Sequence, residues 1–542
     1  MTLTLEHFLD LIDELPKRVN LDYVKAGTNK IQLDGVDHVE KHISATKVDT
    51  EKGSTKSANI TTENLRMFVN KVVENKPLHI ESVWNGSGSA RSAWEGLFAH
   101  TSEFYTHFSK GRKHLVWIPT HPHTAGEITP LTNDLLDYLS TIKSALDEQI
   151  YKYINIITAI KTKPFLLLAG ISGTGKSRIV RELARACWDE DSTECKAQKP
   201  KNFEMIQVKP NWHDSTELIG YVSRVSGEPI FITGDFLKFI AKAWENIDVP
   251  HFLCLDEMNL APVEQYFAEF LSVIESRKKN NDGNIITTDP IIKPEFEINK
   301  DDGTKKVKAW YSKLVTELLA ECSPEKVFAL TKQFEEYGIS IPQNLIVIGT
   351  VNMDETTFSF SRKVLDRAMT IEMNEADLYA GLDSKYERIG KLNSDMLIGT
   401  AVEGVDVYAD NEEVCNKALT YLQAVNDVLD GTPFKIAYRT RNEFLLYVVN
   451  NLPYNMNENG NEFSEDEVIA TALDEITSMK ILSRIEGDDT KVKHSLLEKL
   501  IITIETQLLA LTGEDKKIKS VSIAKLKEMQ GRLSSGYTSF WS

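Results

Sequence analysis

The chain has 542 residues, of which 42% are hydrophobic and 26% charged, a length and composition typical of a soluble globular protein with about three domains. Its net charge of −18 argues against a protein that coats nucleic acid through charge alone, and no apolar run approaches the roughly 18–20 residues that cross a bilayer. Five scattered cysteines without a CxxC pair argue against a zinc site and a disulfide framework. Acidic residues within the apolar N-terminal stretch argue against a signal peptide. We therefore expect a cytoplasmic protein without a membrane partner.

Residues 1–125 differ in charge from the rest of the chain. They contain as many basic as acidic residues and most of the histidines, whereas the remainder carries the whole negative charge. Strand-like runs such as 114–119 alternate with polar loops, which predicts a mixed α+β domain. We expect a separate module with its own partner; the plain alternative is variation in surface composition. The segment 120–130, which contains proline and glycine, is predicted as a linker.

A parallel sheet is predicted in the middle of the chain. The short apolar runs 165–170, 251–257 and 344–352 are separated by helical patterns, as in sheets that helices cover on both faces. A helix is expected over 132–160, where leucine and isoleucine recur at helical spacing. The polar stretch 278–310 is predicted as a hairpin insertion between two core strands.

Helical spacing dominates from about residue 376 onward, with 418–429, 441–449 and 499–511 as the clearest cases. This region is predicted to be all-α. We therefore expect three domains: a mixed α+β domain over 1–125, an α/β domain over 126–375 and an all-α lid domain over 376–542.

Residues 170–177 read GISGTGKS and match the P-loop pattern GxxxxGK[ST]. The motif follows a predicted strand and precedes a predicted helix, which is the context that the chemistry needs. Its glycines let backbone N–H groups surround phosphates, Lys176 reaches the β- and γ-phosphates, and Ser177 can bind Mg²⁺. The candidate nucleotide-binding residues here are Gly170, Gly173, Thr174, Gly175, Lys176, Ser177 and Arg178.

Two further strands are predicted to end in catalytic side chains. Asp256 and Glu257 follow an apolar run about 80 residues after the P-loop, so we expect Asp256 to join Ser177 at the Mg²⁺ and Glu257 to orient or deprotonate the attacking water. Asn352 ends the next such run and is expected to touch the γ-phosphate or the water. A turn asparagine without function is the alternative for Asn352.

Arginines after the third strand are candidates for action between subunits. In ring-forming NTPases such an arginine reaches the neighbour's γ-phosphate, and Arg367 is the first candidate, with Arg362 as the alternative. A surface ion pair between Arg367 and Asp366 is the competing interpretation. In the helical region, Arg439 or Arg441 is a candidate second sensor over the nucleotide.

The segments 255–277 and 349–373, together with 208–221 and 536–541, resemble McrB-type AAA+ proteins over about residues 160–540. These proteins are the motor subunits of modification-dependent, McrBC-like restriction systems. The resemblance implies an AAA+ fold, a hexameric ring, GTP preferred over ATP with Mg²⁺, and a separate McrC-like nuclease subunit. It also implies an N-terminal domain that recognises DNA, often with a modified base.

One position departs from the resemblance. The family signature often reads MNTxD, with the acid three residues after the asparagine, whereas this chain has Asp354 two and Glu355 three residues after Asn352. Both acids therefore stay candidates for the signature role. No nuclease motif stands out; the acids and lysine of 294–300 are interpreted as hairpin surface charges, so cleavage would fall to the partner.

DNA recognition by residues 1–125 would need basic groups for phosphates and aromatic or polar groups for bases. The cluster 110–114 is basic, and Trp84, Trp94 and Trp117 are candidates for an aromatic pocket around an extruded base, with plain core packing as the alternative. His121 and His123 are assigned to the linker rather than to a metal.

Two rival functions share the same motifs. One is a MoxR-like, ATP-driven remodeller of proteins, in which 1–125 is an adaptor. The other is a nucleotide-gated scaffold in an antiviral complex, in which turnover hardly matters.

Overall fold

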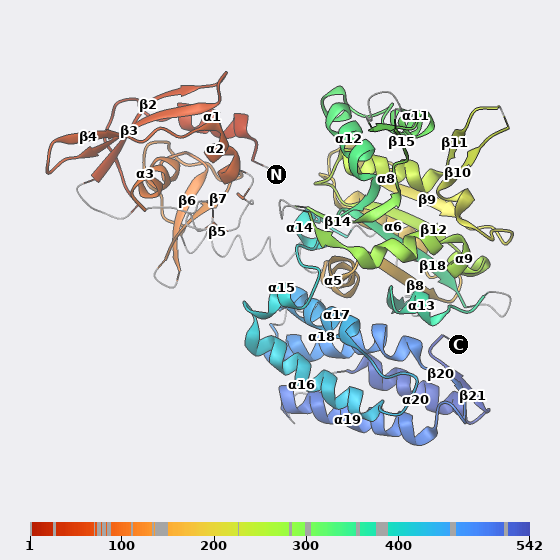
Figure 1. Cartoon of the computed structure of the whole chain (residues 1–542). Coiled ribbons are helices and arrows are strands. Elements are labelled where there is room, and N and C mark those ends of the chain that lie inside the picture. The colour runs from red at the N-terminus through yellow and green to blue at the C-terminus, as the bar shows by residue number, and fades with distance from the viewer. Residues whose placement is uncertain are drawn as a thin grey trace. The chain divides into compact units, whose positions relative to one another are not determined.

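The computed structural model describes most of the chain as two compact units, residues 1–145 and 146–542 (Figure 1). The described residues are 3–24, 29–69, 71–72, 77–78, 83, 88–109, 112–132, 135, 150–225, 227–280, 285–298, 305–353, 358–374, 389–455, 462–513 and 519–541. Among them, no helix combines the length and the apolar character needed to cross a bilayer.

The N-terminal unit is a mixed α/β fold, as the sequence predicts. Four phenylalanine rings form the centre of its core, because Phe8 packs against Phe68, Phe98 and Phe104 with centroids 4.9–5.8 Å apart. An antiparallel sheet has the order β1-β2-β3-β4 and a second has the order β5-β7-β6. The elements are α1 (Leu5–Asp13), β1 (Leu21–Asp22), β2 (Asn29–Asp37), β3 (His42–Asp49), β4 (Ser54–Ser57), α2 (Thr62–Val69), β5 (Pro77–Leu78), α3 (Gly88–Ala99), β6 (Phe104–Ser109) and β7 (Arg112–Trp117).

The segment 120–130 is part of this unit and not a linker. The His123 N–H donates to the Ser102 carbonyl at 2.7 Å, and the Thr106 N–H donates to the Thr129 carbonyl at 2.9 Å. The prediction of a linker was wrong because backbone hydrogen bonds to β6 and to the residues just before it hold this proline- and glycine-containing stretch. Most of the helix predicted over 132–160 lies outside the described residues; its end is α5 (Ile154–Thr162).

A five-stranded parallel sheet forms the centre of the larger unit, which confirms the predicted α/β fold. Its strand order is β19-β8-β18-β12-β9. Along β8, Leu166 and Leu168 belong to one apolar core and Leu167 to the other, since successive side chains of a strand point to opposite faces. The strands are β8 (Phe165–Gly170), β9 (Phe203–Gln207), β12 (His251–Asp256), β18 (Leu345–Asn352) and β19 (Met369–Glu372).

Helices and insertions surround this sheet. Between strands lie α6 (Lys176–Ala186), α7 (Thr193–Lys196), α8 (Asp235–Glu245), α9 (Val263–Tyr266), α10 (Ala268–Val273) and α13 (Arg362–Leu365). The hairpin β10 (Gly220–Ser223) and β11 (Ile230–Thr233) lies between β9 and α8.

The insertion near 278–310 is larger than the predicted hairpin. β14 (Ile286–Ile292) pairs with β13 (Lys278–Lys279) on one side and with β17 (Ile339–Pro342) on the other. Two helices, α11 (Ala309–Leu318) and α12 (Pro324–Tyr337), lie between β14 and β17 along the chain. A hairpin of β15 (Phe296–Ile298) and β16 (Lys305–Val307) is part of it. The Glu295 carboxylate there accepts from the Lys308 ammonium at 2.7 Å, in agreement with the surface-hairpin interpretation.

The C-terminal region is helical, as predicted, apart from one two-stranded sheet of β20 (Glu486–Asp488) and β21 (Tyr537–Ser539). Its apolar side chains form one continuous core with α5 and α6. The C-terminal Trp541 indole donates to the Ser483 carbonyl at 3.1 Å and so fixes the aromatic end of the chain. The helices are α14 (Ser394–Leu397), α15 (Val405–Tyr408), α16 (Glu412–Val428), α17 (Tyr438–Asn451), α18 (Glu465–Lys480), α19 (His494–Thr512) and α20 (Val521–Leu533).

A partly buried acid in this region gives a pH-dependent stability prediction. Burial raises the pKa of Glu475 from 4.5 to about 7, and the Tyr447 hydroxyl donates to its carboxylate at 2.6 Å. Between these two pKa values the folded chain binds more protons than the unfolded chain, so this residue lowers stability as the pH rises through that window. We expect Glu475→Gln to stabilise the chain by about 2 kcal/mol more near pH 8 than near pH 5, as measured by urea unfolding. A difference between variant and wild type that is the same at both pH values would contradict the assignment.

Candidate functional site

The P-loop turns sharply out of β8 because three glycines adopt positive φ. At Gly170, with φ +149°, a Cβ atom would lie 2.4 Å from the Met373 carbonyl oxygen, so only glycine fits. Gly173 and Gly175 have φ of +88° and +83°, and a Cβ would meet nothing within 4 Å there. Gly175 is the N-cap of the eleven-residue helix α6. The loop therefore places backbone N–H groups and a helix N-terminus around one concave turn, which suits a phosphate chain.

Lys176 is the charged group of this loop. It is 5% exposed, and its ammonium donates to the carbonyl oxygens of Gly170 at 3.0 Å and Ile171 at 2.7 Å. The loop is closed further by the Thr174 hydroxyl, which donates to the Ile171 carbonyl at 3.1 Å. Arg178 lies on the first turn of α6 and is exposed. The ammonium can exchange its carbonyl partners for phosphate oxygens, to which it binds more strongly because they are charged.

The two predicted Mg²⁺ ligands lie side by side. The Ser177 hydroxyl donates to Asp256 Oδ1 at 2.5 Å, although 79 residues separate them. Thr350 on β18 also donates to this carboxylate oxygen, at 2.9 Å. No cluster of three or more His, Cys, Asp or Glu side chains suited to a metal occurs in the described part of the chain. The donor set fits an ion such as Mg²⁺ that keeps water and phosphate oxygens as its other ligands.

Glu257 and Asn352 also meet at this edge of the sheet. Glu257 is a non-glycine residue in the left-handed region, with φ 54° and ψ 49°, and its N–H donates to the Thr350 hydroxyl at 3.0 Å. The Asn352 amide donates to Glu257 Oε1 at 3.2 Å. A left-handed conformation costs about 1–2 kcal/mol outside glycine, and strain of this kind concentrates at functional sites. Asp354 and Glu355 lie outside the described residues.

Sequence reasoning missed three residues that hold the site together. Thr350 bridges Asp256 and the Glu257 backbone. Asn259 donates to the Asn352 carbonyl at 2.9 Å, and Asn374, after β19, accepts from the Ile171 N–H of the P-loop at 3.1 Å. A threonine inside the apolar run 344–352 was the one visible signal, since a hydroxyl in a buried strand needs a partner.

Arg367 lies at the amino-terminal ends of the parallel strands, whereas the P-loop lies at their carboxyl ends. It precedes β19, whose first residue, Met369, pairs with Leu166 near the start of β8, whereas the P-loop follows the end of β8 at Gly170. Four residues of strand span about 13 Å, so Arg367 is poorly placed to reach the nucleotide of its own subunit. Asp366, the acid of the alternative surface ion pair with Arg367, pairs instead with Arg484 at 2.9 Å.

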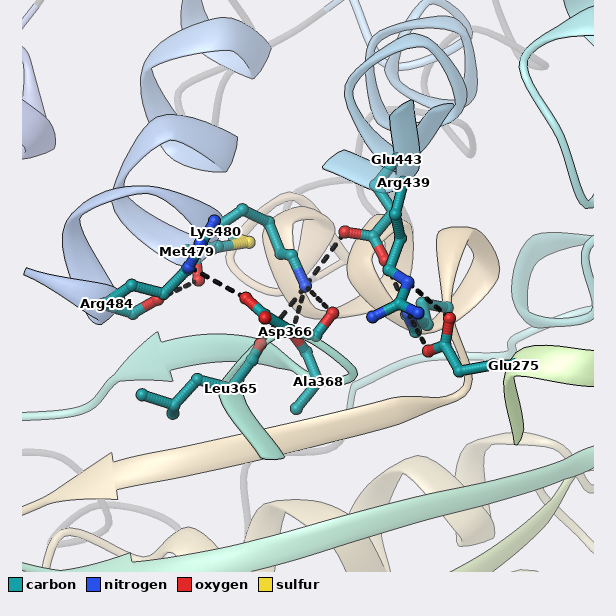
Figure 2. Close-up of polar contacts among 11 residues, drawn as sticks. Glu275, Leu365, Asp366, Ala368, Arg439, Glu443, Met479, Lys480 and Arg484 are labelled. Atoms are coloured by element: carbon teal, nitrogen blue, oxygen red, sulfur yellow. Dashed lines mark hydrogen bonds and ion pairs between the residues drawn. The ribbon is translucent and has the colours of Figure 1, made fainter. Parts of the chain in front are cut away.

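The other candidate arginines have partners elsewhere. Arg362 donates to the Pro433 carbonyl at 3.1 Å and lies over the Phe434 ring. Arg439 pairs with Glu275 at 2.5 Å (Figure 2), and Glu275 also pairs with Lys163, just before β8. The structure therefore brings Arg439 to the start of β8 and not to the P-loop. Arg441 lies over the Tyr438 ring.

The two aromatic candidates that the structure describes, Trp94 and Trp117, pack into the core of the N-terminal unit. Trp117 is 1% exposed and its indole donates to Glu103 at 2.7 Å, while the half-buried Trp94 donates to the Ala58 carbonyl at 2.9 Å. Both tryptophans therefore have the structural role of core packing, which was the alternative to an aromatic pocket. Trp84, Lys110 and the side chains of 111–113 lie outside the described residues. His123 contacts the Phe104 carbonyl through Nε2 at 2.9 Å, a structural role.

Together these groups can hold a nucleoside triphosphate and activate water. The P-loop and Lys176 could provide positive charge for phosphates, and Ser177 and Asp256 could provide oxygen ligands for Mg²⁺. Glu257, which accepts a hydrogen bond from Asn352, would provide a carboxylate near bound phosphates. This is the set of parts that phosphoryl transfer to water needs.

Comparisons with known proteins agree with this arrangement. Residues 165–327 match the family described as AAA domain (dynein-related subfamily), and residues 397–537 match a domain of unknown function, DUF8727. The chain is also similar to the Type II restriction enzyme NmeDI of Neisseria meningitidis serogroup C, with 29% identity over 148 residues. That alignment covers 25% of this chain and 40% of the relative. The larger unit thus contains an AAA nucleotide-binding domain, followed by a helical region.

Proposed function

We propose that this protein is the nucleotide-hydrolysing AAA+ motor subunit of a McrBC-like DNA restriction complex, with GTP preferred over ATP. In this proposal it forms a ring, most simply a hexamer, and recognises and translocates DNA that a separate McrC-like nuclease cleaves. The observation that carries the hydrolytic part is the cluster of Ser177, Asp256, Thr350, Glu257 and Asn352 beside the P-loop. The restriction part is supported by the printed name of the relative and by the segments that resemble McrB-type proteins.

Each residue then has one task during hydrolysis. Lys176 and the loop N–H groups bind the β- and γ-phosphates, and Asn352 fixes the Glu257 carboxylate. Mg²⁺ held by Ser177 and Asp256 would neutralise phosphate charge. Water attacks the γ-phosphorus in line with the bond to the β–γ bridging oxygen, that bond breaks, and the water proton passes to Glu257. The products are the nucleoside diphosphate and phosphate.

A trans-acting Arg367 completes the site in a ring. Because its own P-loop lies at the far edge of the sheet, its guanidinium would stabilise the γ-phosphate of a neighbouring copy. GTP preference rests on the resemblance, and Asp354 and Glu355 both stay candidates for the signature acid.

One surface favours a second candidate function, an ATP-driven remodeller of proteins. The hairpin of β10 and β11 exposes apolar side chains, which are Tyr221, Val222, Val225, Ile230 and Ile232. Exposed apolar clusters mark surfaces that bind other macromolecules, and a polypeptide is one such ligand.

The effect of added ligands on hydrolysis separates these two functions. We expect GTP hydrolysis by the purified chain to rise several-fold with duplex DNA, tested with and without methylated bases, and to rise further with a co-expressed nuclease from the same gene cluster. An unfolded polypeptide is expected to have no effect. ATP hydrolysis that responds to the polypeptide and not to DNA would overturn the restriction proposal in favour of the remodeller.

A further inference from the structure

A buried lysine of the helical region holds the backbone on both sides of Arg367. Lys480 is the last residue of α18 and is 1% exposed. Its ammonium donates to the carbonyl oxygens of Leu365 at 3.3 Å, Asp366 at 3.0 Å and Ala368 at 2.8 Å (Figure 2). The helix α13 ends at Leu365, and carbonyls at the end of a helix lack partners within the helix, so a cation there is favourable.

A buried glutamate pairs with this lysine. Glu443 on α17 lies 2.9 Å from the Lys480 ammonium and 2.5 Å from that of Lys163, and all three groups are buried. Burial lowers the pKa of Lys480 to about 8, while Glu443 acts against this effect. Such a buried cluster is weak evidence for stability, because removing charges from water costs about as much as their attraction returns. Its geometry suggests a further task.

A second cation of the same region holds the side chain next to Arg367. Arg484, in the short helix Leu482–Arg484, pairs with Asp366 at 2.9 Å (Figure 2). Among the described residues, Asp366 forms its ion pair with Arg484 and not with Arg367. The Arg367 Nε atom itself is buried and has no hydrogen-bond partner among the residues that the structure describes. These contacts hold the backbone on both sides of Arg367, while the neighbouring Asp366 carboxylate pairs with Arg484.

We propose that Lys480 and Arg484 are positioning residues that hold Arg367 in the orientation in which it reaches the nucleotide of a neighbouring copy of the chain. This inference rests on the proposed ring and names the residues that regulate its shared site. The helical region thereby sets how well one subunit activates hydrolysis in the next. A misplacement of about 1 Å at a catalytic group can cost about 100-fold in rate, so the loss of either contact is expected to lower turnover strongly.

Mixing two defective variants tests the inference, because a defect in Arg367 belongs to the neighbour's site. The Lys480→Met subunit still has an intact P-loop, and the Lys176→Ala subunit still has a correctly held Arg367. A mixed ring therefore contains sites in which both parts are intact. We expect Lys480→Met alone to hydrolyse nucleotide at least about 10-fold more slowly at nearly unchanged KM. Addition of excess Lys176→Ala, which is inactive alone, should raise the rate per Lys480→Met subunit several-fold, as it should for Arg367→Ala. Arg484→Gln should behave in the same way, and Lys480→Arg should retain most activity.

A matched buried lysine provides the contrast. Lys525 on α20 pairs with Glu372 at the other end of β19 at 2.6 Å, and Glu372 accepts from Asn374, which contacts the P-loop. Lys525→Met should therefore impair the nucleotide site of its own subunit. We expect it to raise KM, and addition of Lys176→Ala should not restore the rate.

The outcomes separate this inference from the function on which it rests. Rescue of Arg367→Ala and Lys480→Met supports both. If Lys176→Ala rescues Arg367→Ala, but Lys480→Met and Arg484→Gln either have normal activity or are not rescued, the positioning role is wrong and the shared site is still supported. Arg367→Ala with full activity, or without rescue, overturns the shared site and the positioning role with it.

Discussion

A Glu257→Gln variant is expected to bind nucleotide as the wild type does and to hydrolyse it at least about 100-fold more slowly, the usual contribution of a positioned general base. Glutamine keeps the shape of the side chain and can still contact Asn352, which lies 3.2 Å from Glu257 Oε1. It cannot accept the proton of the attacking water. Fluorescent nucleotide binding and single-turnover phosphate release would measure the two properties separately.

The matched control for this variant is Glu264→Gln. Glu264 is an exposed acid on α9, seven residues further along the chain, and should tolerate the change in both assays. A Glu257→Gln variant with more than about a tenth of wild-type turnover would mean that another group, such as Asp354 or Glu355, accepts the proton.

A Lys176→Ala variant is expected to lose both nucleotide affinity and turnover, the latter by about 100-fold or more. The ammonium is the one side-chain cation that the loop 170–177 encloses, and it lies within 3.0 Å of two loop carbonyls. Without it, the phosphates would be held by N–H groups and the helix terminus alone. Isothermal titration with a non-hydrolysable analogue and steady-state phosphate release would record the two losses.

Lys332→Ala is the control for this change. Lys332 is an exposed lysine on α12, in the insertion, and its removal alters the charge of the chain by the same amount. Equal activity of Lys176→Ala and Lys332→Ala would contradict the assignment of the P-loop as the nucleotide site.

Local sequence patterns were sufficient to predict the centre of the fold. Runs such as 165–170 and 344–352 are mainly apolar, as is typical of strands buried on both faces, and the loop after the first of them carries the P-loop pattern. The proximity of Ser177, Asp256, Glu257 and Asn352 could be expected because the carboxyl ends of parallel strands lie at the same end of a sheet. The structure brings them within hydrogen-bonding distance of one another in pairs.

Contacts between distant segments were beyond these patterns. Thr350 signals from the sequence only that a buried hydroxyl needs a partner, and the alignment of β12 with β18 is needed to identify that partner. Asn374 looks like an ordinary residue until β19 is aligned with β8. Arg439 lies in the first turn of α17, a helix that could be placed over the nucleotide or away from it, and only its pairing with Glu275 shows its position. The segment 120–130 has the composition of a linker, yet backbone hydrogen bonds hold it to β6, and composition does not report such bonds.

The helical region illustrates the same limit. Lys480, Glu443 and Lys163 are 37 and 280 residues apart along the chain, and nothing in their local sequence signals a cluster. Buried lysines are rare unless paired, so each must find its acid through the tertiary fold. The proposed positioning of Arg367 therefore emerges only from the structure.

Steady-state phosphate release from GTP and from ATP, measured for the purified chain with Mg²⁺ and with and without duplex DNA, tests the central claim most directly. The account predicts GTP hydrolysis that requires Mg²⁺, rises with DNA and disappears in Lys176→Ala. A wild-type chain that hydrolyses neither nucleotide, or a Lys176→Ala variant that matches it, would contradict the account.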